Sequence, residues 1–225
     1  TNTYANSIND RGEIIGSSTN AANSTYAFIW DKVNGMRSLG GLEKVAVGND
    51  TISSAQKNNN FGETIGFSYN VSNQQKAFSG NFYDGIIDIG TLGGITANAQ
   101  TVSDLNYITG YSDSLTASYI TTLWRPGKSP KALLSLVDTV SNWNFSQIQT
   151  NNKCFMGSSG WNPSTGSQRA LLLKPINNLP PFSIRERIGV VQNTAKNFTV
   201  KSIDPENGAL TYSIVASPAN GTLTG

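Results

Sequence analysis

The side chains that most often carry chemistry in proteins are scarce in this sequence. Its 225 residues include no histidine, one cysteine and 14 aspartates and glutamates. Without histidine the chain forms neither a Ser-His-Asp triad nor a His-ligated metal site. A single cysteine excludes an internal disulfide and a Cys-rich zinc site. Cys154 lacks a histidine partner, so we expect a small buried apolar residue and not a nucleophile.

Most carboxylates stand in segments rich in Asn and Gly, as Asp10, Asp31, Asp84 and Asp104 do. Turns favour Asp because its side chain hydrogen-bonds nearby backbone N–H groups. A glycosidase needs two carboxyl groups facing each other across a pocket, and no pair is marked by its surroundings. The sequence therefore favours turn roles and predicts a protein that is not an enzyme. A hydrolase or lyase acting on polysaccharide is the alternative.

Two tryptophans are the candidate ligand-binding residues. Trp143 and Trp161 lie in segments rich in Asn, Ser and Gly, and loop aromatics present large contact areas to ligands. The other reading makes them shields of the interior from solvent. Trp30 and Trp124 end apolar segments instead, and we expect them in the core between repeats.

A calcium site is the one cofactor candidate. Asp204 and Glu206 supply the oxygen ligands that calcium prefers, and Asn177 and Asn178 lie in a linker just upstream of that module. Two carboxylates are few for a tight site, however, and Asp204–Gly208 reads equally well as a simple turn.

The elements that position these residues are predicted to be β-strands. Apolar runs of four to seven residues, rich in Ile, Val, Tyr, Phe and Trp, are separated by Asn, Gly and Ser, which is typical of strands and turns. The one arguable helix, 131–140, follows Pro130 and ends in β-branched residues, which favours strand or turn. The sequence therefore predicts an all-β protein.

The strands recur in a four-fold repeat of about 47 residues. A glycine after two mostly apolar residues marks each unit, at Gly16, Gly66, Gly110 and Gly157. A turn precedes each glycine; the four predicted turns are 9–12, 59–62, 103–106 and 150–153. A second apolar segment follows each one. Such a glycine indicates a β-bulge or a close approach of two backbones.

Each unit carries about four strand signals. In the first unit these are 4–8, 13–17, 26–30 and 36–39. Four short antiparallel strands in 40–50 residues are typical of a propeller blade, so residues 1–175 are predicted to form a propeller-like array of four repeats. The fourth unit shows only three clear strand signals.

The segments "SINDRGEIIGSS", "YAFIWDKVNGMRSLGGL" and "KAFSGNFYDGIIDIGTLGG" resemble the HAF repeat of bacterial secreted and surface proteins. The likeness is strongest over 4–94 and weaker over 97–175. That family carries His before Ala-Phe, where this chain has Tyr26, Lys76, Ile120 and Arg169. The resemblance implies an extracellular module of the β-propeller kind and no enzymatic activity.

A different pattern begins after Pro175. Residues 176–181 contain Pro180 and Pro181 and are predicted to be a linker. Residues 182–225 resemble the first half of a cadherin-like or bacterial immunoglobulin-like repeat, with period-two segments "FTVKSI" and "LTYSIV" joined by the turn Asp204–Gly208. A β-sandwich needs about seven strands, so we expect a truncated module in a longer protein.

These features predict a non-enzymatic binding or adhesion module, extracellular or on a bacterial cell surface, that recognises a glycan or a protein. A structural spacer is a further alternative. The net charge of +2 with no basic run argues against nucleic acid. No apolar run approaches the roughly 20 residues that span a bilayer.

Overall fold

The computed structural model describes residues 2–42, 52–137, 142–151, 154–176, 178–183 and 188–223, with only the backbone of Gln147. It divides into two compact units, Thr1–Pro175 and Ile176–Gly225, which are described separately below. The described residues form antiparallel strands and a single short 3-10 helix, η1 (Leu133–Leu136). The all-β prediction is confirmed.

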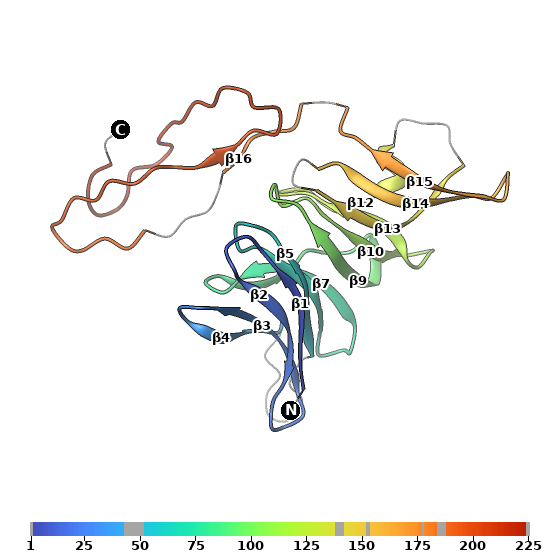
Figure 1. Ribbon diagram of the computed structural model, residues 1–225, viewed down its shortest axis with the longest axis horizontal. Coiled ribbons are helices and arrows are strands. Elements are labelled where there is room, and N and C mark those ends of the chain that lie inside the picture. Colours follow the sequence, from blue (N-terminus) through green and yellow to red (C-terminus); the bar gives the residue numbers. More distant parts are fainter. Residues whose placement is uncertain are drawn as a thin grey trace. The chain divides into compact units, whose positions relative to one another are not determined.

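The first unit contains four antiparallel sheets, each built from strands that follow one another in the chain (Figure 1). The first sheet consists of β1 (Thr3–Ile8), β2 (Ile14–Thr19), β3 (Thr25–Asp31) and β4 (Gly35–Gly40), and the second of β5 (Ser53–Asn58), β6 (Thr64–Tyr69), β7 (Gln75–Asn81) and β8 (Gly85–Asp88). The third consists of β9 (Gly93–Val102), β10 (Ile108–Ser114), β11 (Ile120–Trp124) and β12 (Lys131–Ala132), and the fourth of β13 (Asn144–Thr150), β14 (Met156–Asn162) and β15 (Ser167–Leu173).

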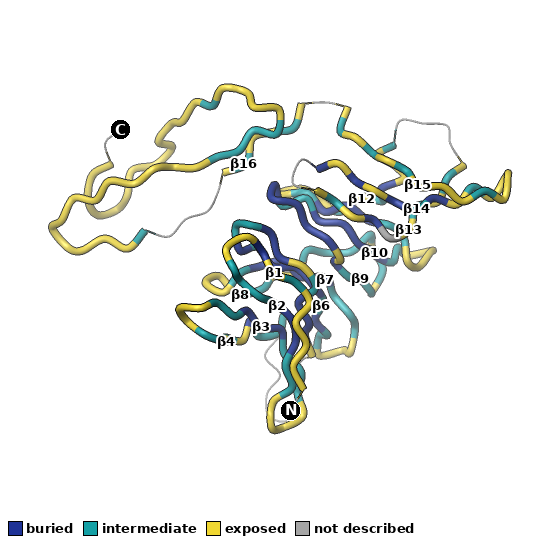
Figure 2. Tube along the Cα trace, in the orientation of Figure 1, coloured by how far each residue is buried: buried dark blue, intermediate teal, exposed yellow. Residues whose placement is uncertain are grey.

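The first strand of each later sheet packs on the middle strands of the sheet before it. Thus β5 contacts β2 and β3, β9 contacts β6 and β7, and β13 contacts β10 and β11. Ile15, Ala27 and Ile29 of the first sheet pack on Ala55 and Phe78 of the second. The buried residues accordingly concentrate in these sheets (Figure 2). The propeller arrangement itself stays a prediction.

Three of the repeated glycines are required by a close approach of two strands. A Cβ on Gly16, Gly66 or Gly110 would lie 1.8–2.0 Å from a backbone carbonyl oxygen of the neighbouring strand. The register of that strand shifts beside the glycine in all three sheets. The bulge and the close approach predicted from the sequence therefore occur together.

The predicted position of the repeat in the fourth unit was wrong by one residue. A Cβ on Gly157 would meet nothing within 4 Å, and Gly157 pairs with Gln149 ahead of the register shift. Ser158 therefore takes the place of Gly16. The turn shifts likewise, because the N–H of Cys154 bonds the carbonyl of Asn151 at 3.0 Å. Cys154 has a φ of 59° and occupies the position that Gly12, Gly62 and Asn106 occupy in the earlier turns. It is buried, as predicted.

Two other predictions meet the structure in part. Segment 131–140 begins as the short strand β12 and continues as η1, and its residues 138–140 lie outside the described residues. Over the described part of this segment, the favoured strand interpretation therefore holds only for β12, and the helical alternative holds only for the single turn η1. Among the described residues the fourth sheet has three strands, which matches its three clear strand signals and not the four strands predicted for each repeat.

The second unit has little regular structure. Its described residues form two short paired strands, β16 (Phe182–Ser183) and β17 (Ser202–Ile203). The strand predicted over 210–215 is absent from the described backbone, and only the end of "FTVKSI" is a strand. Most of its described residues are exposed (Figure 2). The β-sandwich module therefore remains a prediction from sequence resemblance.

Candidate binding site at the turn ends of the sheets

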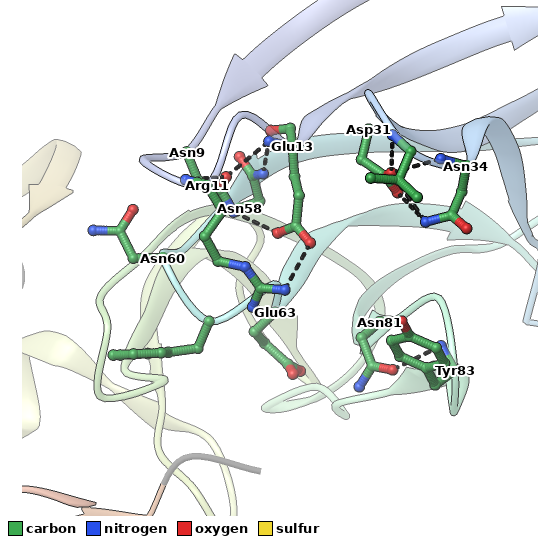
Figure 3. A network of polar contacts seen from close by, with 12 residues as sticks. Asn9, Arg11, Glu13, Asp31, Asn34, Asn58, Asn60, Glu63, Asn81 and Tyr83 are labelled. Carbon is green, nitrogen blue, oxygen red and sulfur yellow. Dashed lines mark hydrogen bonds and ion pairs between the residues drawn. The ribbon is translucent and has the colours of Figure 1, made fainter. Parts of the chain in front are cut away.

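In each four-stranded sheet the turn between the first two strands lies at the same end as the turn between the last two, because adjacent strands are antiparallel. We call residues 9–13, 59–63 and 103–107, together with Asn151, Cys154 and Phe155 of the fourth sheet, the inner turns, and residues 31–35 and 81–85 the outer tips. Figure 3 shows side chains from the first two inner turns and both outer tips. A network of polar contacts lies at this end of the first unit.

Asn9 and Asn59 each close their own inner turn and also reach the next one. The Oδ1 of Asn9 accepts from the N–H of Arg11 and of Glu13, at 3.1 and 3.0 Å. Its Nδ2 donates to the carbonyl of Asn59 at 2.8 Å. Both asparagines are buried, 8% and 4% exposed. One side chain therefore shapes a turn and joins two sheets.

The row continues into the third and fourth sheets. The Nδ2 of Asn59 donates to the carbonyl of Ser103 at 3.1 Å and to Oδ1 of Asn106 at 2.6 Å. The Ser103 hydroxyl lies 3.4 Å from the Sγ of Cys154. Successive inner turns are thus linked by side chains across all four sheets.

A second, more exposed row runs beside the first. The Nδ2 of Asn60 donates to Oδ2 of Asp10 at 2.8 Å and to Oδ2 of Asp104 at 3.3 Å. The N–H of Asp10 bonds Oδ1 of Asn60, and the N–H of Asn60 bonds Oδ1 of Asp104. The two carboxylates approach each other with an amide held between them.

Glutamates follow the inner turns. Arg11, whose side chain is 55% exposed, forms an ion pair with Glu13 at 3.2 Å, and Glu13 also accepts from Nδ2 of Asn9 at 2.7 Å. The equivalent Glu63 accepts from the hydroxyl of Ser79. Figure 3 shows the bonds of Glu13, and both carboxylates are engaged by the protein's own donors.

The outer tip of the first sheet is built around Asp31. Its Oδ1 accepts from the N–H of Val33 and from both the N–H and the side chain of Asn34. The two bonds from Asn34 are the main reason that the pKa of Asp31 is lowered. Asp31 also pairs with Arg37, whose guanidinium lies 3.8 Å from the centre of the Phe82 ring in the second sheet.

The outer tip of the second sheet has the same hydrogen-bond pattern, with asparagine first and aspartate last in place of the reverse order. Oδ1 of Asn81 accepts from the N–H of Tyr83 and of Asp84, and its Nδ2 donates to the carboxylate of Asp84 at 2.9 Å. Tyr83 is 65% exposed and its ring meets Phe82 edge to face. An exposed aromatic surface therefore stands at the same end as the polar rows.

The structure does not bring the two candidate tryptophans together. Trp161 lies within β14 and not in a loop, and it is 47% exposed. Trp143 immediately precedes β13 and lies beside Gly160. Since successive residues of a strand point to opposite faces, Gly160 and Trp161 face opposite sides of the sheet. Trp143 and Trp161 therefore do not form one stacking platform.

The calcium candidates are engaged with the backbone. Oδ1 of Asp204 accepts from the N–H of Glu206 and of Gly208, and Oε1 of Glu206 accepts from the N–H of Leu179 at 3.2 Å. Asn178 donates to the carbonyl of Leu179, and Asn177 lies outside the described residues. In the described part of the chain, no three Asp, Glu or Cys residues gather as a metal site would require.

A shallow hollow of about 290 Å³ lies on the second sheet. It contains Lys76, the residue at the position where the HAF pattern has histidine, and the Nζ of Lys76 donates to the carbonyl of Ile95 at 2.9 Å. The remaining lining residues are Leu42, Asn70, Ile86, Ile87 and Asp88.

The sequence identified the turns but not the links between them. The available signal was the recurrence of polar residues at the first two positions of each turn, Asn9-Asp10, Asn59-Asn60 and Ser103-Asp104. Equivalent positions of stacked repeats meet each other, so recurring amides there indicate a ladder.

Comparison of the chain with protein-family models, curated proteins and solved structures found no match. The resemblance to HAF repeats and to cadherin-like modules thus rests on the quoted residues alone. Over the described ranges, the structure has no helix of the length and apolar character that crossing a membrane requires.

Proposed function

We propose that the chain is a non-enzymatic binding or adhesion module of a bacterial secreted or surface protein, and that it recognises a glycan or protein partner at the turn end of the first unit. The observation that carries this proposal is the linked row of inner turns. Loops on a rigid scaffold are where binding residues concentrate, and here each loop is fixed by bonds to its neighbour.

The groups available at this end suit a hydroxyl-rich ligand. Asp10 and Arg11 are exposed beside the inner turns, and Tyr83 is exposed at the outer tip. Carboxylate and guanidinium groups bond sugar hydroxyls, and an aromatic face packs on the apolar face of a sugar. The resemblance to HAF repeats supports the extracellular location.

The arrangement of Asp10 and Asp104 favours binding over glycoside hydrolysis. A glycosidase leaves room between its two carboxylates for the scissile bond and, in inverting enzymes, for a water molecule. Here the amide of Asn60 occupies that space and bonds both groups. A polysaccharide hydrolase or lyase is still the alternative function, but Asp10 and Asp104 are not a candidate pair of catalytic carboxylates for it.

The test is a glycan array and a polysaccharide-binding assay with the full chain, repeated with Tyr83→Ala and Arg11→Ala. Both variants are expected to weaken binding. Tyr119→Ala is the control, because Tyr119 is at least as exposed as Tyr83, 74% against 65%, and lies at the opposite end of its sheet. Binding that survives both changes would move the site elsewhere. No binding to any glycan or surface protein at high concentration would favour a structural spacer.

A further inference from the structure

A row of apolar side chains crosses the first sheet on one face. Ile8, Ile14, Trp30 and Met36 are successive cross-strand partners on β1, β2, β3 and β4, and such partners share a face. Ile8 is 63% and Met36 50% exposed, and the two others are half-buried. Since the adjacent Ile15 and Ile29 pack on the second sheet, this row points away from it.

The third sheet carries nearly the same row in a covered state. Val102, Ile108 and Trp124 are successive partners there, and they are 5%, 4% and 3% exposed. They pack with Ile65 and Ala77 of the second sheet. The two rows consist of similar apolar side chains. They differ in exposure because the second sheet packs on the row of the third sheet, whereas no described sheet precedes the first.

The opposite end of the stack presents the complementary surface. By register, Ala170 and Leu172 of β15 occupy the positions of Ala27 and Ile29 in β3. Ala27 and Ile29 are 0% and 3% exposed beneath the second sheet, whereas Leu172 is 60% exposed. Ala170 is also exposed. In the first sheet these positions pack against the sheet that follows. The same face of the fourth sheet is therefore exposed.

We propose that the chain self-associates head to tail, with the fourth-sheet face (Gly157, Ala170, Leu172) of one copy packed on the first-sheet face (Ile8, Ile14, Trp30, Met36) of a second. The joint continues the interface that the chain already makes three times within itself. Each copy carries one face of each kind, so a second copy covers one of them and the other stays open to a further copy. Burial of exposed apolar side chains drives the association.

The experiment is sedimentation velocity on the full chain from about 1 μM to about 1 mM, a range that covers weak self-association. The average mass of the natural sequence is expected to rise with concentration. Ile8→Lys and Leu172→Lys each place a charge in the joint and are expected to raise the dissociation constant more than about tenfold. Circular dichroism melts verify that both variants fold.

A mixture of the two variants distinguishes this joint from any symmetric one. Ile8→Lys keeps an intact fourth-sheet face and Leu172→Lys an intact first-sheet face, so the mixture forms a one-to-one dimer that grows no further. Leu115→Lys is the control, because Leu115 is 87% exposed in the turn between β10 and β11 and belongs to neither face. The proposal is overturned if the natural chain stays monomeric, if the mixture does not dimerise, or if the control weakens association equally. A monomer would point to another sheet repeat in a longer chain as the occupant.

Discussion

Two turns in different units of the molecule have the same local design and different surroundings. Oδ1 of Asn59 accepts from the N–H two and four residues ahead, at 3.0 and 2.9 Å. Oδ1 of Asp204 does the same, at 3.0 and 2.8 Å. Asn59 is 4% exposed and joins the second sheet to the third, whereas the turn at Asp204 is followed by exposed residues without strands.

The difference lies in the donor that an amide has and a carboxylate lacks. Asparagine uses its oxygen for its own turn and its Nδ2 for the neighbouring sheet, but ionised aspartate is an acceptor only. The hydrogen bonds of Asp204 therefore shape its turn without joining it to a neighbouring sheet. In the first unit the amides convert a series of hairpins into a linked stack, and four predictions probe that contrast.

The largest effect is expected from Asn59→Asp. The change keeps the acceptor for the turn, removes the donor to Ser103 and Asn106, and buries a carboxylate near the Ser103 carbonyl. We expect the free energy of unfolding to fall by about 3 kcal/mol, measured by urea denaturation at neutral pH. The matched exchange in the second unit, Asp204→Asn, should change it by less than about 0.5 kcal/mol. Equal effects from the two exchanges would refute the contrast.

Gly66→Ala is expected to rank second. Its Cβ would lie 2.0 Å from the carbonyl oxygen of Ser54, a backbone atom that has to move. We expect a loss of about 2 kcal/mol from this crowding, measured as a lower urea midpoint. Gly157→Ala is the control within the first unit and Gly189→Ala is the control in the second, since a Cβ at either position meets nothing within 4 Å. A loss at Gly157 as large as that at Gly66 would contradict the corrected alignment of the fourth repeat.

A smaller effect is expected from the titration of Asp31. Its pKa is lowered in the folded chain, chiefly by the N–H of Asn34 and then by the side chain of that residue. Such a group adds stability above its unfolded pKa of about 4, and the contribution is lost as the pH falls through the lowered value. Below about pH 4 the melting temperature of the natural chain should therefore fall more than that of Asp31→Asn. Asn81 makes the equivalent bonds in the second sheet, so we expect Asp31→Asn to preserve the conformation of the first outer tip. Identical pH profiles would show that Asp31 contributes nothing.

No effect is expected from calcium on the second unit. The carboxylates of Asp204 and Glu206 already accept backbone hydrogen bonds, and a calcium ion would have to displace some of these. Thermal melting with millimolar calcium and with a chelator should give the same midpoint. An upward shift with calcium that Asp204→Asn removes would instead establish the site that the sequence suggests.

The repeat gave reliable strands wherever its spacing was regular. Segments 4–8, 13–17, 26–30 and 36–39 all lie in or across strands of the first sheet, since alternation and turn residues are local signals. The fourth unit was misplaced by one residue because Gly157 follows two apolar residues just as Gly16 does. Only the strand register shows that Ser158 stands opposite the bulge. In the second unit the period-two pattern of 210–215 predicted a strand that the described backbone does not form.

The candidate site divides in the same way. The sequence located the polar turns and named Trp143 and Trp161 as candidate ligand-binding residues. The fold does not set these two on one surface, and their binding role stays a prediction. Trp30 and Trp124 were both predicted to lie in the core between repeats. Trp124 is buried and bonds the Gly90 carbonyl, whereas Trp30 is half-buried on a face that no other described sheet covers. Side chains at equivalent positions of two repeats differ in exposure, because their burial depends on whether a preceding sheet packs on that face.

The sequence by itself determined the all-β class, the repeat and the positions of the first three turns, because short-range steric and hydrogen-bonding preferences set these within a few residues. Tertiary structure decided which amide of each turn meets the next sheet, which apolar rows are covered and which carboxylates are already satisfied. Those outcomes depend on contacts between residues about 50 positions apart, such as Asn9 and Asn59. No local preference encodes them, so only the stacking of the sheets reveals where the chain has groups to offer a partner.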